Sequence, residues 1–133
     1  RQSSIGAMGC SESSCPIFLD FCQGDGEAAF RFASWNVLSP RQLSWSSRSK
    51  QIMDSLEELD PDIVALQEAL PRCPTDSLDN AMAALGYSAH HREPDVDGIE
   101  PPVLYVRRAT FRVIWEDSHQ RTVGAILRPR AFK

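Results

Sequence analysis

Short apolar runs alternate along the chain with stretches in which apolar residues recur at helical spacing. The runs over residues 30–37 and 63–67 are apolar without interruption, which is typical of strands that are buried on both faces. Between them, apolar positions spaced by three and four residues predict a helix over residues 45–59, which ends before Pro61. A strand, a helix and a strand in this order predict two parallel neighbours in one sheet.

The second half of the chain repeats strand and helix signals. A helix is predicted over residues 76–85, because Thr75 or Asp76 can cap its start and Gly86 can end it. Residues 87–91 have the character of a further short strand. Three longer strand-like runs follow, over residues 103–107, 111–115 and 122–127. Without the short strand at residues 87–91, the order is β-α-β-α-β-β-β, which predicts an α/β fold with a mixed sheet.

Each of the two apolar runs ends in one polar side chain, Asn36 in the first and Glu68 in the second. Parallel strands finish at the same edge of a sheet, where open α/β sheets bind ligands. We therefore expect the amide and the carboxylate to lie side by side. A single carboxylate next to a neutral amide suits a hard cation such as Mg²⁺, which binds through one or two carboxylates, waters and substrate phosphate. Taken separately, Glu68 can be a strand-end residue entering solvent, and Asn36 can mark a turn.

Residues 1–29 are predicted to be a flexible N-terminal tail, with residues 30–133 forming the domain. The tail contains Met8-Gly9-Cys10-Ser11-Glu12-Ser13, which fits the pattern for N-myristoylation at Gly9, with Cys10 as a palmitoyl acceptor. This pattern makes a lipid anchor only if Met8 starts translation. A pattern this short also arises by chance.

Composition and charge place few further limits on function. The chain has 133 residues, 42% hydrophobic and 24% charged, which fits at most one globular domain. The net charge of −4 is uneven, since residues 1–104 hold 7 basic and 16 acidic residues, and residues 105–133 hold 7 and 2. A basic C-terminal part suits phosphate, or is simply a solvated surface. The four cysteines match no zinc or disulfide pattern, which favours an intracellular, cytoplasmic protein. No apolar stretch is long enough to span a membrane, so no transmembrane segment is expected.

Several stretches, in order, resemble the endonuclease/exonuclease/phosphatase superfamily over roughly residues 30–128. The first are Ser34–Leu38, the step Trp45-x-x-Arg48 with its helix, and Pro61–Glu68. Leu85-Gly86-Tyr87, Asp97-Gly98 and the run Val103–Arg108 with Phe111 are similar to the family's next motifs. The Trp-x-x-Arg step resembles the branch of poly(A)-shortening deadenylases and nocturnin-like phosphatases. Glu100 before the strand is equally similar to members with unassigned substrates.

The resemblance implies the N-terminal half of a four-layer α/β sandwich and hydrolysis of a phosphoester, with RNA among the substrates, dependent on Mg²⁺ or Mn²⁺. It implies that Glu68 ligates the metal and that Asn36 helps to hold the metal or the phosphate. The family's Asp-x-Asn motif, a further His and a late Asp-His pair have no counterpart here. We therefore expect residues 30–133 to form a partial domain with little activity on its own.

A second hypothesis makes the chain a catalytically inactive half-domain that binds a protein partner through the sheet face its other half would cover. Other side chains have simpler interpretations. The three candidate bases, His90, His91 and His119, are expected to be exposed polar residues. Arg48 is expected on the helix surface or in an ion pair. Trp35, Trp45 and Trp115 are expected in the core.

Overall fold

The computed structural model describes residues 5–6, 17–23, 27–37, 45–69, 78–91, 102–119 and 122–130. Eight strands and two helices lie within these ranges. They are β1 (Ile5–Gly6), β2 (Ile17–Gln23), β3 (Glu27–Asn36), α1 (Trp45–Leu59), β4 (Ile63–Gln67), α2 (Leu78–Ala84), β5 (Tyr87–His91), β6 (Val103–Arg107), β7 (Phe111–His119) and β8 (Thr122–Pro129).

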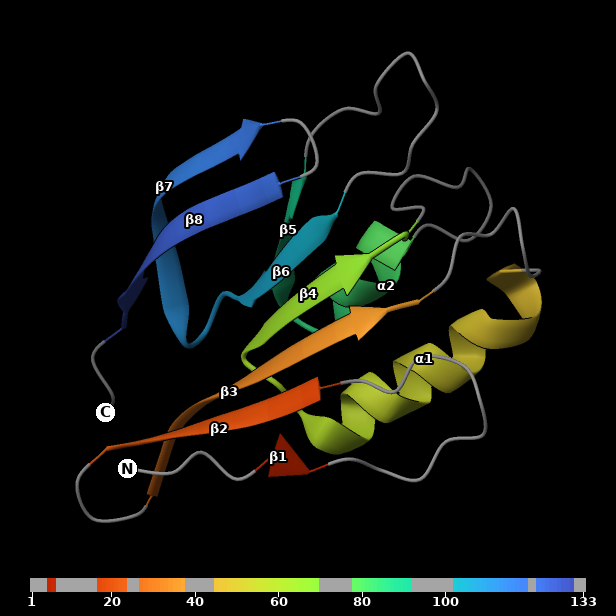
Figure 1. Ribbon diagram of the computed structural model, residues 1–133, viewed down its shortest axis with the longest axis horizontal. Helices are drawn as coiled ribbons and strands as arrows, with labels where there is room; N and C mark the ends of the chain where they lie inside the picture. Colours follow the sequence, from red (N-terminus) through yellow and green to blue (C-terminus); the bar gives the residue numbers. More distant parts are fainter. Residues whose placement is uncertain are drawn as a thin grey trace.

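Six strands form one mixed sheet in the order β1-β2-β3-β4-β6-β5 (Figure 1). Only the β3–β4 pair is parallel, and every other neighbouring pair in this sheet is antiparallel. The parallel pair is the one that α1 connects, as a right-handed crossover requires. The α/β class and the mixed sheet are therefore confirmed, and β5 adds one strand to the predicted order, because residues 87–91 pair fully with β6.

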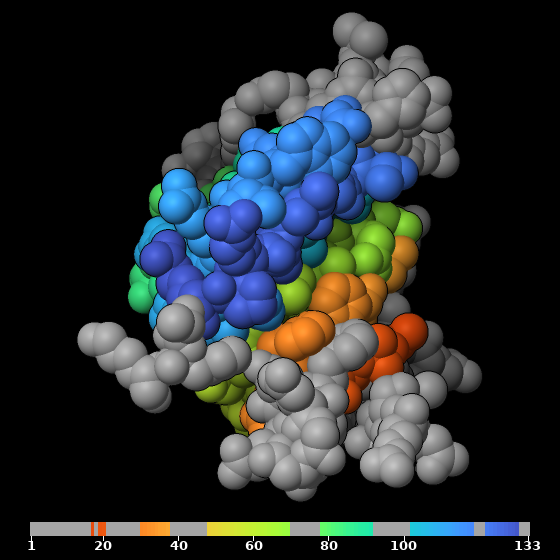
Figure 2. Space-filling model, turned by 90° about the vertical axis from the view of Figure 1, so that its left-hand side faces the viewer, coloured from red at the N-terminus to blue at the C-terminus, as the bar shows by residue number. Residues whose placement is uncertain are grey.

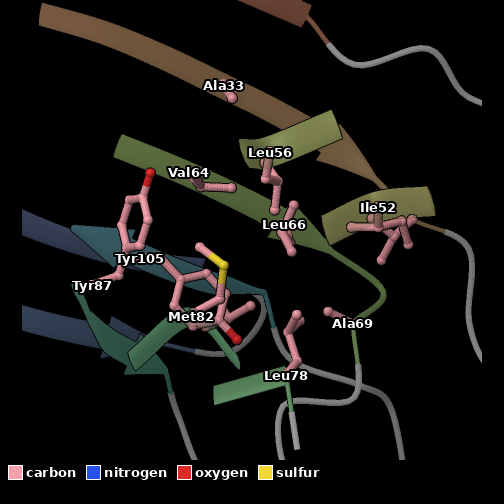
Figure 3. Close-up of a cluster of buried hydrophobic side chains, with 12 residues drawn as sticks. Ala33, Ile52, Leu56, Val64, Leu66, Ala69, Leu78, Met82, Tyr87 and Tyr105 are labelled. Atoms are coloured by element: carbon pink, nitrogen blue, oxygen red, sulfur yellow. The ribbon is translucent and has the colours of Figure 1, made fainter. Parts of the chain in front are cut away.

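Both helices pack on one face of the sheet (Figure 1). The buried core on this side joins side chains from the sheet with others from the two helices (Figure 3). It contains Ala33, Val64, Leu66, Tyr87, Val103 and Tyr105 from the strands, with Ile52, Leu56, Leu78 and Met82 from the helices. These positions alternate along each strand, so the opposite side chains of the same strands face the other side of the sheet.

The β7–β8 hairpin covers that other side (Figure 2). Phe111, Val113 and Leu127 pack against Ile63 and Val106 of the main sheet in a second, smaller core. Phe30 also meets Phe111 edge to face, with ring centroids 5.6 Å apart. The described residues therefore form three layers, which are a helical layer, the six-stranded sheet and the hairpin.

The prediction of a flexible tail is wrong for Ile17–Gln23, which forms β2 and pairs antiparallel with β3. The register joins Leu19 to Phe32 and Phe18 to Ala33. Strand pairing of this kind is a tertiary contact, so the local Ser, Gly and acidic composition of the N-terminal segment did not reveal it. The six-stranded sheet therefore includes residues before residue 30.

Trp115 does not lie in the core, and its side chain is 53% exposed. A β-bulge between Val113 and Trp115 is the reason. Val113 pairs with Leu127 and packs inward, whereas the extra residue lets Trp115 pair with Ile126, which points outward. Trp35 is partly buried against the helix-side core. The side chain of Trp45 lies outside the described residues.

Asp62, the residue before β4, contacts β3, β6 and the turn before β7 at the end of the sheet opposite to Asn36. One carboxylate oxygen accepts a hydrogen bond from the backbone N–H of Arg31 (2.9 Å), and the other accepts one from the Thr110 hydroxyl (2.6 Å). The Arg107 guanidinium lies 3.8 Å from the same carboxylate. Arg107 also stacks on the Tyr87 ring, at 4.7 Å from its centroid, and binds Asp60. We call Asp62 with these contacts the Asp62 clamp.

Candidate metal and phosphoester site

Asn36 and Glu68 lie next to each other, at the ends of the two parallel strands. Asn36 is the last residue of β3, and Glu68 directly follows β4. In the parallel register Asn36 is opposite Gln67, so the two polar residues reach the same edge. The Asn36 amide nitrogen Nδ2 donates a hydrogen bond of 2.9 Å to Glu68 Oε1. The predicted juxtaposition of this amide and this carboxylate is confirmed.

The backbone of Glu68 is left-handed, with φ of 55°. A residue with a Cβ adopts this conformation at a cost of about 1–2 kcal/mol, and such residues gather at functional sites. The surrounding chain holds it, since Val37 donates its N–H to the Gln67 carbonyl at 3.0 Å and Ala69 is fully buried. This turn directly follows β4, and in it the Glu68 carboxylate accepts the hydrogen bond from Asn36.

The donor set fits a hard cation. A carboxylate oxygen can only accept, so the atom of Asn36 that faces Glu68 is the nitrogen, and the carbonyl oxygen Oδ1 points elsewhere. One carboxylate and one amide oxygen, with waters and substrate oxygens, make a coordination shell that Mg²⁺ or Mn²⁺ accepts. Among the described residues, no group of three or more His, Cys, Asp or Glu side chains is arranged to hold a metal. Glu68 and Asn36 would thus supply part of such a shell.

Arg48 does not behave as an exposed surface residue. Its side chain is half-buried, and its Nη1 donates to the backbone carbonyl of Val37, the residue after Asn36. This hydrogen bond links α1 to the residue that follows β3. The expectation of an exposed helix-surface residue was wrong, because the fold brings the Val37 carbonyl to this guanidinium, and the alternative of an ion pair stays a prediction.

The two adjacent histidines are not exposed either, with His90 and His91 side chains 15% and 9% exposed. His90 contacts the Ser88 hydroxyl at 2.9 Å through Nε2 and the Glu116 carboxylate through Nδ1. This pair of contacts links β5 of the main sheet to β7 of the hairpin. These contacts give His90 a structural role between the main sheet and the hairpin.

His91 lies on the helix side of β5, where it meets Asp79 at 3.3 Å. The same carboxylate accepts a hydrogen bond of 2.8 Å from the Tyr105 hydroxyl. Burial, followed by the neighbouring Asp79 charge, raises the pKa of the Tyr105 phenol, so this hydroxyl stays a donor. The network fixes the start of α2 on the sheet. The side chain of His119 lies outside the described residues.

Ser34 and Gln67, to which the sequence pattern assigns no role, lie directly beside the Asn36–Glu68 pair. Gln67 donates to the Ser34 hydroxyl at 3.2 Å across the two strands. A signal for this pair was present, since Ser34 and Asn36 are two residues apart and share a face of β3. Met8, Gly9, Cys10, Asp97 and Glu100 lie outside the described residues, so lipidation remains a prediction.

Comparisons with known proteins show the family and a protein of similar fold. A model of the endonuclease/exonuclease/phosphatase family matches residues 33–130, so the chain belongs to this family. A search of curated proteins found no match. The crystal structure of ANGEL2, a 2′,3′-cyclic phosphatase, is similar in fold, with a TM-score of 0.60 and 18% sequence identity. The similarity covers 66% of this chain and 30% of that one, so the chain spans less than a third of the neighbour's length.

No helix among the described residues is long and apolar enough to cross a membrane.

Proposed function

We propose that this chain contributes the Asn36–Glu68 half of a phosphoesterase site that uses Mg²⁺ or Mn²⁺ to hydrolyse a phosphodiester or phosphomonoester. Membership of the endonuclease/exonuclease/phosphatase family supports a phosphoesterase. The observation that carries the assignment to these residues is the 2.9 Å hydrogen bond between Asn36 and Glu68 at the shared edge of two parallel strands.

In this proposal, the cation supplies Lewis-acid stabilisation of the phosphoryl oxygens. Glu68 supplies a carboxylate oxygen to the cation and neutralises part of its charge. Asn36 orients that carboxylate through the hydrogen bond that its Nδ2 donates to Glu68 Oε1. Among the described residues, no group of three or more His, Cys, Asp or Glu side chains is arranged to hold a metal, so this proposal assigns the remaining ligands and the base for the attacking water to residues outside the Asn36–Glu68 pair. We therefore expect the chain alone to show little turnover.

We also propose RNA as a substrate, within an intracellular, cytoplasmic protein. The structural neighbour is a 2′,3′-cyclic phosphatase, and the Trp-x-x-Arg step is similar to that of deadenylases. The test is hydrolysis of three substrates: a generic nitrophenyl phosphodiester, a short oligoadenylate and an RNA ending in a 2′,3′-cyclic phosphate. Each is assayed with Mg²⁺, with Mn²⁺ and with EDTA, using the chain and any longer natural form that contains it.

The decisive variant is Glu68→Gln, which keeps the shape of the side chain and removes its charge. We expect the metal-dependent rate to fall more than about 100-fold, since loss of a ligand exceeds the 10–100-fold cost of losing a supporting contact. The matched control is Glu58→Gln on the exposed side of α1, which should leave the rate unchanged. Hydrolysis that persists in EDTA, or that survives Glu68→Gln, would overturn the proposal.

One observation favours a second function, that of a binding module. Ile114, Trp115 and Ile126 are 46%, 53% and 53% exposed and gather on the outer face of the β7–β8 hairpin. A protein partner with an apolar surface would cover this outer face. The module hypothesis predicts no metal-dependent hydrolysis in any form, together with complexes that Trp115→Ser disrupts. Metal-dependent turnover that Trp115→Ser leaves intact would contradict it.

A further inference from the structure

Gln67 lies directly beneath the candidate site and faces the same way as Asn36. It is the last residue of β4, it precedes Glu68, and it is the register partner of Asn36. Register partners on neighbouring strands share a face of the sheet. Ser34, two residues before Asn36, shares that face as well. The three side chains therefore belong to one polar strip that ends at the Glu68 turn.

The orientation of the Gln67 amide follows from its partners. Nε2 lies 3.2 Å from the backbone carbonyl of Ala65 and 3.2 Å from the Ser34 hydroxyl oxygen. A carbonyl oxygen only accepts hydrogen bonds, so the atom facing it is the nitrogen and not the oxygen of the amide. One side chain thus binds its own strand and the neighbouring strand, one step below the edge where the site lies.

This contact fixes the part of the backbone on which the site depends. Just above it, the Gln67 carbonyl accepts the N–H of Val37 at 3.0 Å. Glu68 then enters its left-handed turn at φ 55°. Because that conformation is unfavourable for glutamate, the structure around it must hold it in place. The Ser34–Gln67 hydrogen bond and the Val37–Gln67 backbone bond hold β3 and β4 together on either side of Asn36.

We propose that Gln67 is a positioning residue of the Asn36–Glu68 site, acting through its hydrogen bonds to Ser34 and to the Ala65 carbonyl. It holds the two strand ends in the register that lets Asn36 donate to Glu68, so that the carboxylate meets a hydrated divalent cation in one orientation. This inference rests on the proposed function for its consequence in metal binding. The hydrogen-bonded geometry itself does not depend on the metal.

The test measures Mn²⁺ affinity by electron paramagnetic resonance for the wild-type chain and four variants. Gln67→Met keeps the length of the side chain and removes its amide, and Ser34→Ala removes the hydroxyl. We expect each to weaken binding about 10-fold, as loss of a contact that orients a ligand does. Ser34→Thr, which keeps a hydroxyl, should restore the affinity. Gln51→Met, on the exposed side of α1, is the matched control and should change nothing.

The double variant and a metal-free measurement separate positioning from general destabilisation. The effects of Gln67→Met and Ser34→Ala should not add, because both remove the same hydrogen bond. In the metal-free chain, the side-chain amide protons of Asn36 should shift in both variants and keep their wild-type resonances in Gln51→Met. Additive losses, a wild-type affinity in Gln67→Met, or unchanged Asn36 resonances would each overturn the inference.

The proposed function fails in a different way. If the wild-type chain binds no Mn²⁺, or if Glu68→Gln binds it as well as wild type does, the assignment of the metal to Glu68 is wrong. The inference about Gln67 is then decided by the metal-free Asn36 resonances alone. If Glu68→Gln abolishes binding and the Gln67 and Ser34 variants do not weaken it, only the positioning role is wrong.

Discussion

Replacing Asp62 with alanine should cost more stability than any exposed acidic residue, because the Asp62 clamp joins three segments that are distant in sequence. The side chain is 19% exposed, and its two oxygens accept hydrogen bonds from the Arg31 N–H and the Thr110 hydroxyl. Without the carboxylate, both donors lose their partner at the end of the sheet, and the guanidinium of Arg107 loses a counter-charge.

The magnitude follows from those contacts. A hydrogen bond to a charged group contributes about 1.5–3 kcal/mol, so two such bonds contribute about 3–6 kcal/mol. Water can reach part of this carboxylate and would replace some of what is lost, so we expect Asp62→Ala to cost about 3 kcal/mol. Asp62→Asn keeps one acceptor and should cost about half as much. At about 4 °C per kcal/mol, the melting temperature of Asp62→Ala should fall by about 12 °C.

Urea unfolding followed by tryptophan fluorescence measures the free energy, and a calorimetric scan measures the melting temperature. Asp54→Ala is the matched control, since Asp54 is an exposed aspartate of α1 paired only on the surface with Lys50, and its loss should stay within about 0.5 kcal/mol. A loss below about 1 kcal/mol for Asp62→Ala, or equal losses in the two variants, would refute the reasoning.

Three further predictions concern the cores and the hairpin. Leu66→Ala removes a fully buried side chain from the helix-side core and should cost about 3 kcal/mol, measured by urea unfolding; a loss under 1 kcal/mol would contradict its burial. Burial, the largest cause, raises the pKa of Tyr87 from 10.0 to about 12. Above pH 10 the unfolded chain therefore loses this proton first, and the free energy of unfolding should fall by about 2 kcal/mol by pH 12. In alkaline unfolding series Tyr87→Phe should decline less steeply, and identical slopes would show that Tyr87 does not titrate in this way. Trp115→Ser should change the unfolding free energy by less than about 0.5 kcal/mol, whereas Val113→Ala should cost about 1 kcal/mol; the reverse order would place the bulge elsewhere.

The elements that the sequence predicted most accurately are those whose signals are local. Residues 45–59 form α1, residues 63–67 form β4, and residues 87–91 and 103–107 form β5 and β6, all within the predicted bounds. α1, β4 and β6 have a clear apolar pattern, and Pro61 follows α1. Asp60 there adopts φ of 44° and donates its N–H to the Leu56 carbonyl, which closes the helix as expected.

The elements that were missed depend on contacts between distant residues. β2 is held by its pairing with β3, and Trp115 points outward because of a bulge that only the partner strand reveals. Neither Arg48 nor His90 is an exposed surface residue, because the fold brings each a partner from another part of the chain, the Val37 carbonyl for Arg48 and the Glu116 carboxylate for His90. A period of two residues says which positions share a face, and it does not say which register or bulge the neighbour imposes.

The candidate site was predictable in placement because it depends on one rule about parallel strands. Asn36 and Glu68 each end an apolar run, and the crossover brings both ends to one edge. The contribution of Gln67 was hidden, because a glutamine between an apolar strand and a glutamate has no distinguishing pattern. Its role needs the register that places it opposite Asn36.

The central claim is that Glu68 and Asn36 together meet a divalent cation, and a Mg²⁺ titration of the ¹⁵N-labelled chain followed by NMR tests it most directly. The account predicts that the largest shifts occur at the side-chain amide of Asn36 and the backbone amides of Glu68 and Ala69, and that Glu68→Gln abolishes them. Shifts centred on other residues, or a titration unchanged by Glu68→Gln, would contradict it.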